Sequence, residues 1–382
     1  MLFDFGLRSS LLLIFFFHGL VLGGVLWYQA WRHEQTSSRW LAVFVWLCVL
    51  YISPWMLGFA NWYSQQPYRN LLFYLPLQHL FLFGPVLLRY TQSLFEAKSS
   101  PWQILHFLPA LAYLAYSIWV GVADAWVLDE PYYYADGRDK DFARGYQVAG
   151  LLHMLFFLGL CIVHYRRYQQ RLNQEVSYAE ALRRRWVPRY LAVFFVMQVL
   201  RLGFLLTLPT WHRFGDQGWY LILFSILFYY IAMRGYTQSV ASAVTTQPPL
   251  QLPKAPVSDL PPMVTEDDRE VGMERIRQVM DQQRLYEDPQ LTLSRLAEAV
   301  DMSPHETSAT INQGFAVNFN DFVNRYRVEA VRRAIERGDH KQHTLLSVAL
   351  DQGFNSKSTF NRVFKKHAGM TPAEYVRQQA SE

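Results

Sequence analysis

Cysteine is scarce in this sequence, and acidic residues are missing from its longest apolar stretches. Only two cysteines occur among the 382 residues, Cys48 and Cys161, and both lie inside apolar stretches. Neither a disulfide framework nor a cysteine-based zinc site is therefore indicated. We expect both thiols to pack in an apolar interior.

Seven stretches are long and apolar enough to cross a membrane as helices. A spanning helix needs about twenty residues to cross a hydrocarbon core of roughly 30 Å. None of the seven contains Asp or Glu, as expected where a buried carboxylate is costly. The internal prolines of these stretches can be accommodated by neighbouring helices. The predicted spans are residues 10–31, 40–60, 71–90, 103–123, 147–165, 188–208 and 218–233.

The distribution of Arg and Lys between these spans predicts their orientation. The first span is longer than the core of a signal peptide and no small-residue cleavage site follows it, so we expect it to be retained. The segments that follow the first, third and fifth spans hold most of the loop arginines, seven of them between Arg166 and Arg189. Such loops face the cytoplasm. We therefore predict an inner-membrane protein of a bacterium, with its N-terminus outside and everything after the last span in the cytoplasm.

A change of composition divides the chain into three parts. We expect a transmembrane region over residues 1–234, a flexible linker over residues 235–264 that contains six prolines, and a cytoplasmic region over residues 265–382. A proline-rich linker extends by about 3.1 Å per residue, so it can hold a domain several nanometres from the bilayer. After Thr265, apolar residues at helical spacing predict a helix that packs on the following domain or mediates dimerisation.

From Leu291 onward the apolar spacing predicts two helix-turn-helix units joined by a longer helix over residues 321–337. In the first unit, Ser303 precedes Pro304 and Glu306, the arrangement of a capping box. In the second, Gly353 suits the end of one helix and Ser356 the start of the next, which Gly369 ends. The predicted fold class is therefore all-α.

The last capped helix has a basic outer face. From Tyr286 to the C-terminus the chain has twelve Lys or Arg and twelve Asp or Glu, so the region as a whole is not basic. The positive residues of this helix are nevertheless concentrated on one face, and a helix N-terminus also favours phosphate. The pattern favours nucleic-acid binding over an ordinary solvated helix.

The stretch "LTLSRLAEAVDMSPHETSATINQGFAVNFNDFVNRYRVEAVRRAI", followed by "TLLSVALDQGFNSKSTFNRVFKKHAGMTPAEYVR", resembles the DNA-binding domain of the AraC/XylS family of bacterial transcription regulators. The resemblance covers about the last hundred residues. It rests on Gly353-Phe354, Phe360, Arg362, Phe364-Lys365-Lys366, Gly369 and Thr371-Pro372 at the spacing of the family.

The resemblance implies two recognition helices that enter successive segments of the major groove of double-stranded promoter DNA. Ala309 stands where many members have an arginine, and Thr307 where they have a leucine, so we expect the second helix to carry more of the specificity. By position, the first helix would use His305, Ser308, Ala309 and Asn312, and the second Lys357, Ser358, Thr359, Asn361 and Arg362, with Lys365 and Lys366 nearer phosphate.

The transmembrane region occupies the place of the usual sensing domain of that family. Arg201 lies within the sixth span, where a charge is a candidate functional group. It could bond to backbone carbonyls, extend toward Asp216 or receive an anionic ligand. Three histidines of the spans are further candidates for ligand binding or gating: His18, His79 and His153. A single histidine in a span more often forms a hydrogen bond between two helices.

These patterns together predict a membrane-bound, one-component transcription regulator that is not an enzyme and needs no metal or cofactor. Its expected partners are promoter DNA, the lipid bilayer, an unknown signal ligand, RNA polymerase and a second copy of the chain. The alternatives are a transporter or an intramembrane hydrolase with a regulatory tail, or spans that serve only as an anchor. A metal-dependent hydrolase is disfavoured because no carboxylate and no His-x-x-x-His pair occurs in the spans.

Overall fold

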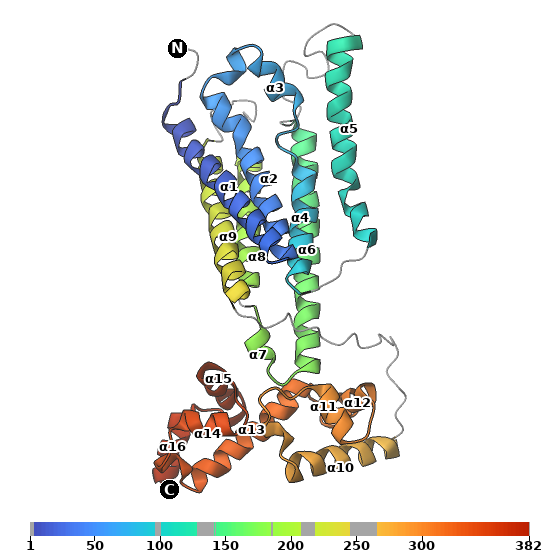
Figure 1. The fold of residues 1–382 in the computed structure, drawn as a ribbon, viewed down its shortest axis with the longest axis vertical. Helices are drawn as coiled ribbons and strands as arrows, with labels where there is room; N and C mark the ends of the chain where they lie inside the picture. Colours follow the sequence, from blue (N-terminus) through green and yellow to red (C-terminus); the bar gives the residue numbers. More distant parts are fainter. Residues whose placement is uncertain are drawn as a thin grey trace. The chain divides into compact units, whose positions relative to one another are not determined.

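The computed structural model describes residues 4–95, 101–127, 141, 143–184, 186–207, 218–244 and 266–381. These residues form helices, loops and one isolated β-bridge, so the predicted all-α class is confirmed (Figure 1). The chain divides into two compact units. The first comprises Met1–Tyr165 and Arg185–Gln251, and the second comprises Arg166–Arg184 and Leu252–Glu382.

The described part of the first unit contains seven complete α-helices and most of an eighth, α6, whose end belongs to the second unit. Six of the helices in the described residues are long and apolar enough to cross a membrane, and these correspond to all the predicted spans except the third. The helices are α1 (Leu7–Arg32), α2 (Thr36–Phe59), α3 (Tyr68–Tyr74), α4 (Leu80–Ser93), α5 (Leu108–Val122), α6 (Arg144–Glu175), α8 (Val187–Thr207) and α9 (Gly218–Val244).

The predicted third span, residues 71–90, is not one continuous helix. It is divided into α3 and α4 by a non-helical segment that contains Pro76 and Gln78. Proline lacks an N–H and collides with the preceding turn, and here the broken backbone has found other partners: Gln78 N donates to Asp141 and Leu80 N to Tyr146. The count of seven spans therefore remains a prediction.

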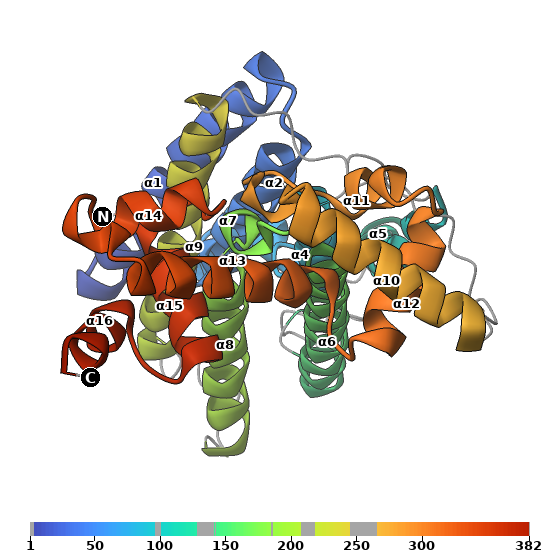
Figure 2. The same cartoon turned by 90° about the horizontal axis from the view of Figure 1, so that it is seen from below.

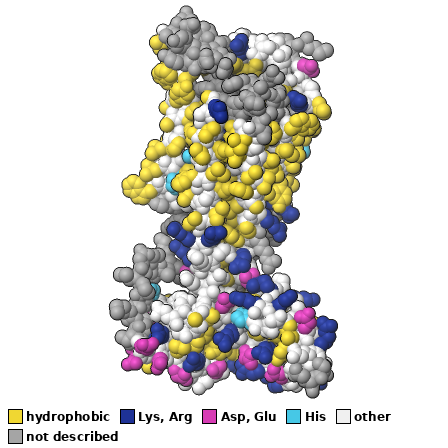
Figure 3. Space-filling view, turned by 180° about the vertical axis from the view of Figure 1, so that it is seen from behind, with side chains coloured by type: hydrophobic (Ala, Val, Ile, Leu, Met, Phe, Trp, Pro, Cys, Tyr) yellow, Lys and Arg dark blue, Asp and Glu magenta, His cyan; other side chains and the backbone are white. Residues whose placement is uncertain are grey.

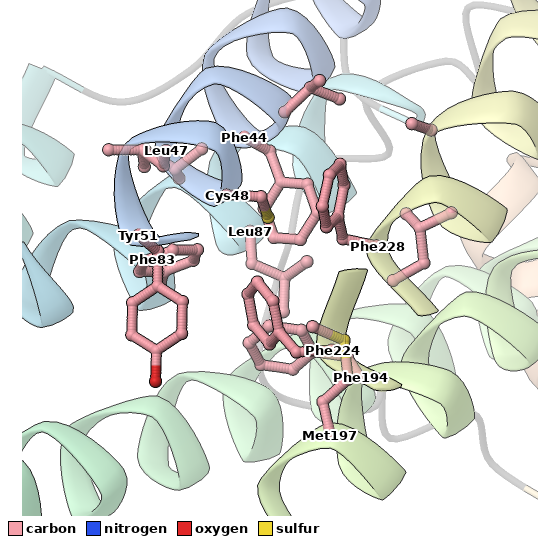
Figure 4. Packing of buried hydrophobic residues seen from close by; sticks show 14 of the residues in the cluster. Phe44, Leu47, Cys48, Tyr51, Phe83, Leu87, Phe194, Met197, Phe224 and Phe228 are labelled. Atoms are coloured by element: carbon pink, nitrogen blue, oxygen red, sulfur yellow. The ribbon is translucent and has the colours of Figure 1, made fainter. Parts of the chain in front are cut away.

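An aromatic and aliphatic core holds the bundle together. Phe44 of α2 lies with its ring centroid 6.1 Å from that of Phe83 of α4 and 6.2 Å from that of Phe194 of α8. Phe224 and Phe228 of α9 complete the cluster (Figure 4). Cys48 and Cys161 are both free and buried, as the sequence predicts.

Small residues let α1 and α2 approach each other closely. A Cβ atom added to Gly19 would lie 2.4 Å from the side chain of Val49, and one added to Gly23 would lie 2.2 Å from that of Trp46. Such close approach at glycine is typical of helix pairs in membranes. The outside of this unit is broadly apolar, with Trp102, Leu152 and Leu206 all more than half exposed (Figure 3). An apolar surface of this extent is compatible with contact with lipid.

α9 continues to Val244, about ten residues beyond the predicted end of the last span. The beginning of the predicted linker, from Gly235 to Val244, is therefore helical. The rest of that linker lies outside the described residues, as do Asp216 and several of the loop residues used to predict the orientation.

The described residues of the second unit form eight shorter α-helices. This unit also includes the segment between α6 and α8, which the sequence had assigned to the membrane region. The helices are α7 (Ala179–Leu182), α10 (Glu266–Gln282), α11 (Leu293–Ala299), α12 (Pro304–Gly314), α13 (Phe319–Glu336), α14 (Leu345–Asp351), α15 (Lys357–Ala368) and α16 (Pro372–Ser381).

α13 belongs to the two larger hydrophobic clusters of this unit. Its N-terminal half, with Phe322 and Val323, packs on α11 and α12, and Ile276 and Met280 of α10 join the same cluster. Its C-terminal half, with Val331, packs on α14, α15 and α16. The long connecting helix predicted over residues 321–337 is thus confirmed. The helix predicted after Thr265 is α10, and it packs on the first helix-turn-helix unit.

Candidate nucleic-acid interface and a buried polar cluster

The first helix-turn-helix unit consists of α11 and α12. Ser303 accepts a hydrogen bond from the backbone N of Glu306, whose side chain accepts one from the backbone N of Ser303. This is the predicted capping box, and Pro304 occupies the first helical position. One side of α12 is buried within this helix-turn-helix unit, and the opposite side of the helix is available for contact.

The residues predicted to read DNA in this unit lie along one side of α12. His305 and Asn312 are exposed, and Ser308 and Ala309 are partly exposed. Asn312 donates to the Oγ of Ser308 over 3.3 Å. Thr307, by contrast, is fully buried and packs inward. The four candidates are therefore brought together on one face, and none of them is Lys or Arg.

The second helix-turn-helix unit consists of α14 and α15. Gly353 ends the turn between them with φ of +86°, in the left-handed region, and an added Cβ would lie 2.3 Å from the carbonyl oxygen of Tyr286. Only glycine fits such a position. Ser356 accepts from the backbone N of Thr359 as N-cap of α15, and Gly369 ends that helix with φ of +77°. These three sequence predictions are confirmed.

The predicted reading residues of α15 project away from its core. Phe360, Val363 and Phe364 are buried, and Thr359 is partly buried, with its hydroxyl accepting a bond from Ser356. The remaining candidates are exposed on the other side of the helix: Lys357, Ser358, Asn361, Arg362, Lys365 and Lys366. The face combines positive charge with hydrogen-bond donors, the chemistry that DNA phosphates and guanine edges bind.

Two carboxylates from elsewhere in the unit meet this basic face. Arg362 forms an ion pair with Glu180 over 3.0 Å, and Lys366 forms one with Asp321 over 2.6 Å. α15 itself contains no Asp or Glu, so both acids come from other helices of the unit. No local pattern could have shown them, because Glu180 is far from Arg362 in the chain.

Arg327 is a buried cation in the middle of α13, the helix that joins the two helix-turn-helix units. Its guanidinium donates to the carbonyl oxygens of Tyr286 and Asp288 and to the side chain of Ser177. Burial lowers the pKa of Arg327 to about 10, so the side chain stays charged at neutral pH. Arg327 thus holds the residues that precede the first helix-turn-helix unit against the connecting helix α13.

In the first unit, Arg201 lies in a buried polar cluster. It donates to the side-chain and backbone oxygens of Gln147 over 2.6 and 3.2 Å. Gln147 in turn donates to the carbonyl oxygen of Asp141 and to Gln78 in the break between α3 and α4. Arg201 is only 4% exposed, and its Nε has no hydrogen-bond partner in the described part of the chain.

The three candidate histidines do not gather around Arg201. His79 is buried next to Gln78, with its ring 5.5 Å from that of Tyr113. His153 lies between the rings of Phe81 and Phe157, and His18 is exposed on α1 with its Nδ1 3.4 Å from the hydroxyl of Tyr229. Within the described ranges, no group of three or more His, Cys, Asp or Glu is arranged to hold a metal ion.

Part of the second compact unit is similar to known proteins. A family model described as "Helix-turn-helix domain" matches residues 296–378. Uncharacterised HTH-type transcriptional regulators of Staphylococcus aureus strains COL and MSSA476 are each 31% identical over 102 residues, which is 27% of this chain and 13% of theirs. The transcriptional regulatory protein HptR of the same species is 27% identical over 103 residues, 27% of this chain and 39% of its own.

The chain thus spans less than half the length of these curated relatives, and the similarity is confined to its C-terminal quarter. No solved structure matches the chain. The match agrees with the two capped units, the shared α13 and the glycine turns described above. The C-terminal part of this protein is a helix-turn-helix domain of the AraC/XylS type.

Proposed function

We propose that this protein is a membrane-bound, sequence-specific transcription regulator that binds promoter DNA through α12 and α15. The observation that carries the proposal is the exposed basic face of α15, which packs on the C-terminal half of α13 while α12 packs on its N-terminal half. Two helices of this kind on one rigid domain suit two successive major-groove segments. The names of the similar bacterial proteins support a role in transcription.

The two helices would share the reading of DNA unequally. Arg362 can bond a guanine through two parallel hydrogen bonds, whereas α12 offers only His305, Ser308, Ala309 and Asn312. Lys365 and Lys366 would contact phosphates. Arg362 and its neighbours on α15 would therefore carry most of the specificity, with α12 contributing position and weaker contacts.

The first unit would reside in the inner membrane of a bacterium. Its apolar surface and long helices support this location, and the loop arginines support an N-terminus outside and a helix-turn-helix domain in the cytoplasm. We expect the regulator to act as a homodimer on DNA and to meet RNA polymerase there. We expect no catalytic activity.

The first unit would also detect a signal. Arg201 supports this role, because a buried cation within a polar cluster of Gln147, Gln78 and Asp141 can respond to an anionic ligand or to a movement of α8 against α6. An anchor without a sensing role is the main rival. A transporter or an intramembrane hydrolase fits less well with a bundle whose interior is mainly aromatic and aliphatic.

Genome-wide DNA occupancy in the native bacterium tests these proposals. The full-length protein is compared with a version that begins at Thr265, under several growth conditions. If both occupy the same promoters but only the full-length protein responds to conditions, the first unit is a sensor. If the two behave identically in every condition, the first unit is an anchor. If neither has specific sites, the assignment of α12 and α15 to DNA is wrong.

A further inference from the structure

The segment Arg166–Arg184, which joins α6 to α8, is folded onto the helix-turn-helix domain. It contains the end of α6, the helix α7 and the turn between them, and it belongs to the second compact unit. Seen from below, α7 overlaps α13 (Figure 2), and Asn320 and Arg327 of α13 donate hydrogen bonds to Ser177, just before α7. Leu172, Val176 and Ala179 of this segment are at most 2% exposed, which is unusual for a short connection between two predicted spans.

Backbone contacts hold the segment to the beginning of the first helix-turn-helix unit. Val176 forms an antiparallel β-bridge with Thr292, and the backbone N of Ser177 donates to the carbonyl oxygen of Leu291 over 3.0 Å. Leu291 and Thr292 immediately precede α11. The segment is therefore joined by one isolated β-bridge to the residues that lead into the DNA-binding domain.

Side chains of α13 complete this attachment. Asn320 is 7% exposed, and its amide donates to the carbonyl oxygens of Val176 and Ser177 over 3.2 and 2.7 Å. Arg327 donates to the hydroxyl of Ser177 over 3.0 Å. A buried amide without acceptors costs about 1–3 kcal/mol, so Asn320 is matched to the docked segment.

The docked segment also brings an acid to the proposed DNA-reading face. Glu180 of α7 lies 3.0 Å from Arg362 and 3.2 Å from Arg183, and its side chain is 10% exposed. A guanidinium bound to this carboxylate cannot also form two hydrogen bonds to a guanine in the same geometry. A fixed carboxylate beside α15 would in addition repel the phosphates of an approaching duplex.

We propose that the segment Arg166–Arg184 is an inhibitory element that competes with DNA for Arg362. In the docked state Glu180 masks the reading face of α15; DNA binds when the segment is released. The ion pair is partly exposed, so it contributes little to the affinity of docking. The buried contacts of Val176, Ser177 and Asn320 hold the segment, and Glu180 provides the competition. The segment is continuous with α6, so a movement of α6 within the first unit can release it.

This inference rests on the proposed function, and the experiment separates the two. The full-length chain in lipid nanodiscs is used to select duplexes from a random-sequence library, and the affinity for the selected duplex is then measured. Failure to enrich any sequence, with the wild type and with Glu180→Gln alike, would overturn the proposed function itself. Enrichment allows the inhibitory element to be tested separately.

The first test compares Glu180→Gln with a matched control, Glu329→Gln. Glu329 pairs with Arg332 on α13 and has no contact with Arg362. We expect Glu180→Gln to bind the selected duplex about 3- to 10-fold more tightly than the wild type, and Glu329→Gln to bind with unchanged affinity. Equal or weaker binding by Glu180→Gln would overturn the inference.

The second test needs no substitution. Hydrogen exchange of peptides that cover residues 174–182 is measured in the wild-type chain with and without the selected duplex. Release of the segment on DNA binding should accelerate exchange at the amide of Ser177, which donates to Leu291 when docked. Asn320→Ala should accelerate exchange there without DNA, with the core of α13 still protected. Unchanged or slower exchange on adding the duplex would contradict the inference.

Discussion

Arg201 of α8 donates a hydrogen bond to the side-chain oxygen of Gln147 of α6 over 2.6 Å. The side-chain amide of Gln147 in turn donates to the carbonyl oxygen of Asp141 and to the side chain of Gln78, which lies in the break between α3 and α4. One cation thus joins four segments of the first unit through hydrogen bonds. Such a cluster is costly to disturb, because each member that loses its partner stays buried and unsatisfied.

Replacement of Arg201 by methionine should therefore destabilise the first unit. A lost buried partner costs about 1–3 kcal/mol, so the melting temperature in detergent should fall by several degrees. Unfolding is followed by the reaction of Cys48 and Cys161 with a thiol-reactive dye, since both thiols are buried in the native bundle. The control is Arg189→Met on the same helix, because Arg189 is exposed. Equal melting temperatures for the two variants would contradict a structural role for the cluster.

The local features of the helix-turn-helix domain could be predicted from the sequence. Ser303, Ser356 and Gly369 act on residues within four positions of themselves, so the spacing of a few residues is sufficient to identify the caps and ends. The connecting helix α13 followed from its apolar periodicity in the same way. Every one of these features depends on short-range contacts.

The features that escaped prediction depend on distant partners. The break at Pro76 is stabilised by Asp141 and Tyr146, which come from a different part of the chain. Glu180 was one acid in a connection rich in arginine, and nothing nearby indicated that it lies against Arg362. Charge counting on a single helix cannot find such an acid, because tertiary structure brings it there.

Replacement of Arg362 by alanine should weaken specific DNA binding and relax the sequence preference at one base position. A bidentate contact between arginine and guanine contributes about 1–3 kcal/mol of discrimination, which is roughly 5- to 150-fold in affinity. The comparison is Asn312→Ala on α12, for which we expect a smaller loss, because its amide already bonds to Ser308. The measurement is the affinity of the full-length chain for the selected duplex and for all single-base variants of it. A larger loss for Asn312→Ala would reverse the assigned roles of α12 and α15.

Replacement of Lys366 by alanine should weaken binding to all sequences alike. Lys366 is paired with Asp321 over 2.6 Å, and in the complex its ammonium would move to a phosphate. A plot of log affinity against log salt concentration has a negative slope. Removal of one phosphate contact makes this slope shallower by about 1. Lys341→Ala is the control, because Lys341 is exposed and lies outside α12 and α15. A change of base preference in Lys366→Ala would show that this lysine reads bases.

Replacement of Ser303 by alanine should open the N-terminus of α12. Loss of an N-cap costs about 1 kcal/mol, so amides in the first turn of α12 should exchange roughly 5-fold faster. Ser358→Ala, at an exposed position of α15, should leave the protection of α12 unchanged.

The capping box also makes the protection of α12 depend on pH. Two hydrogen bonds from Ser303 lower the pKa of Glu306 below its ordinary value. The side-chain bond has the larger effect and the backbone bond the smaller one. A lowered carboxyl pKa stabilises the folded helix above the pKa of the unfolded chain, and this contribution is lost as the pH falls through the folded-state pKa. The wild-type chain should therefore lose protection in α12 on acidification, after correction for the intrinsic exchange rate. Ser303→Ala should show a smaller loss, since it lacks the side-chain bond that is the largest cause of the lowered pKa and keeps only the backbone bond; an equal loss in both chains would exclude Glu306 as the titrating group.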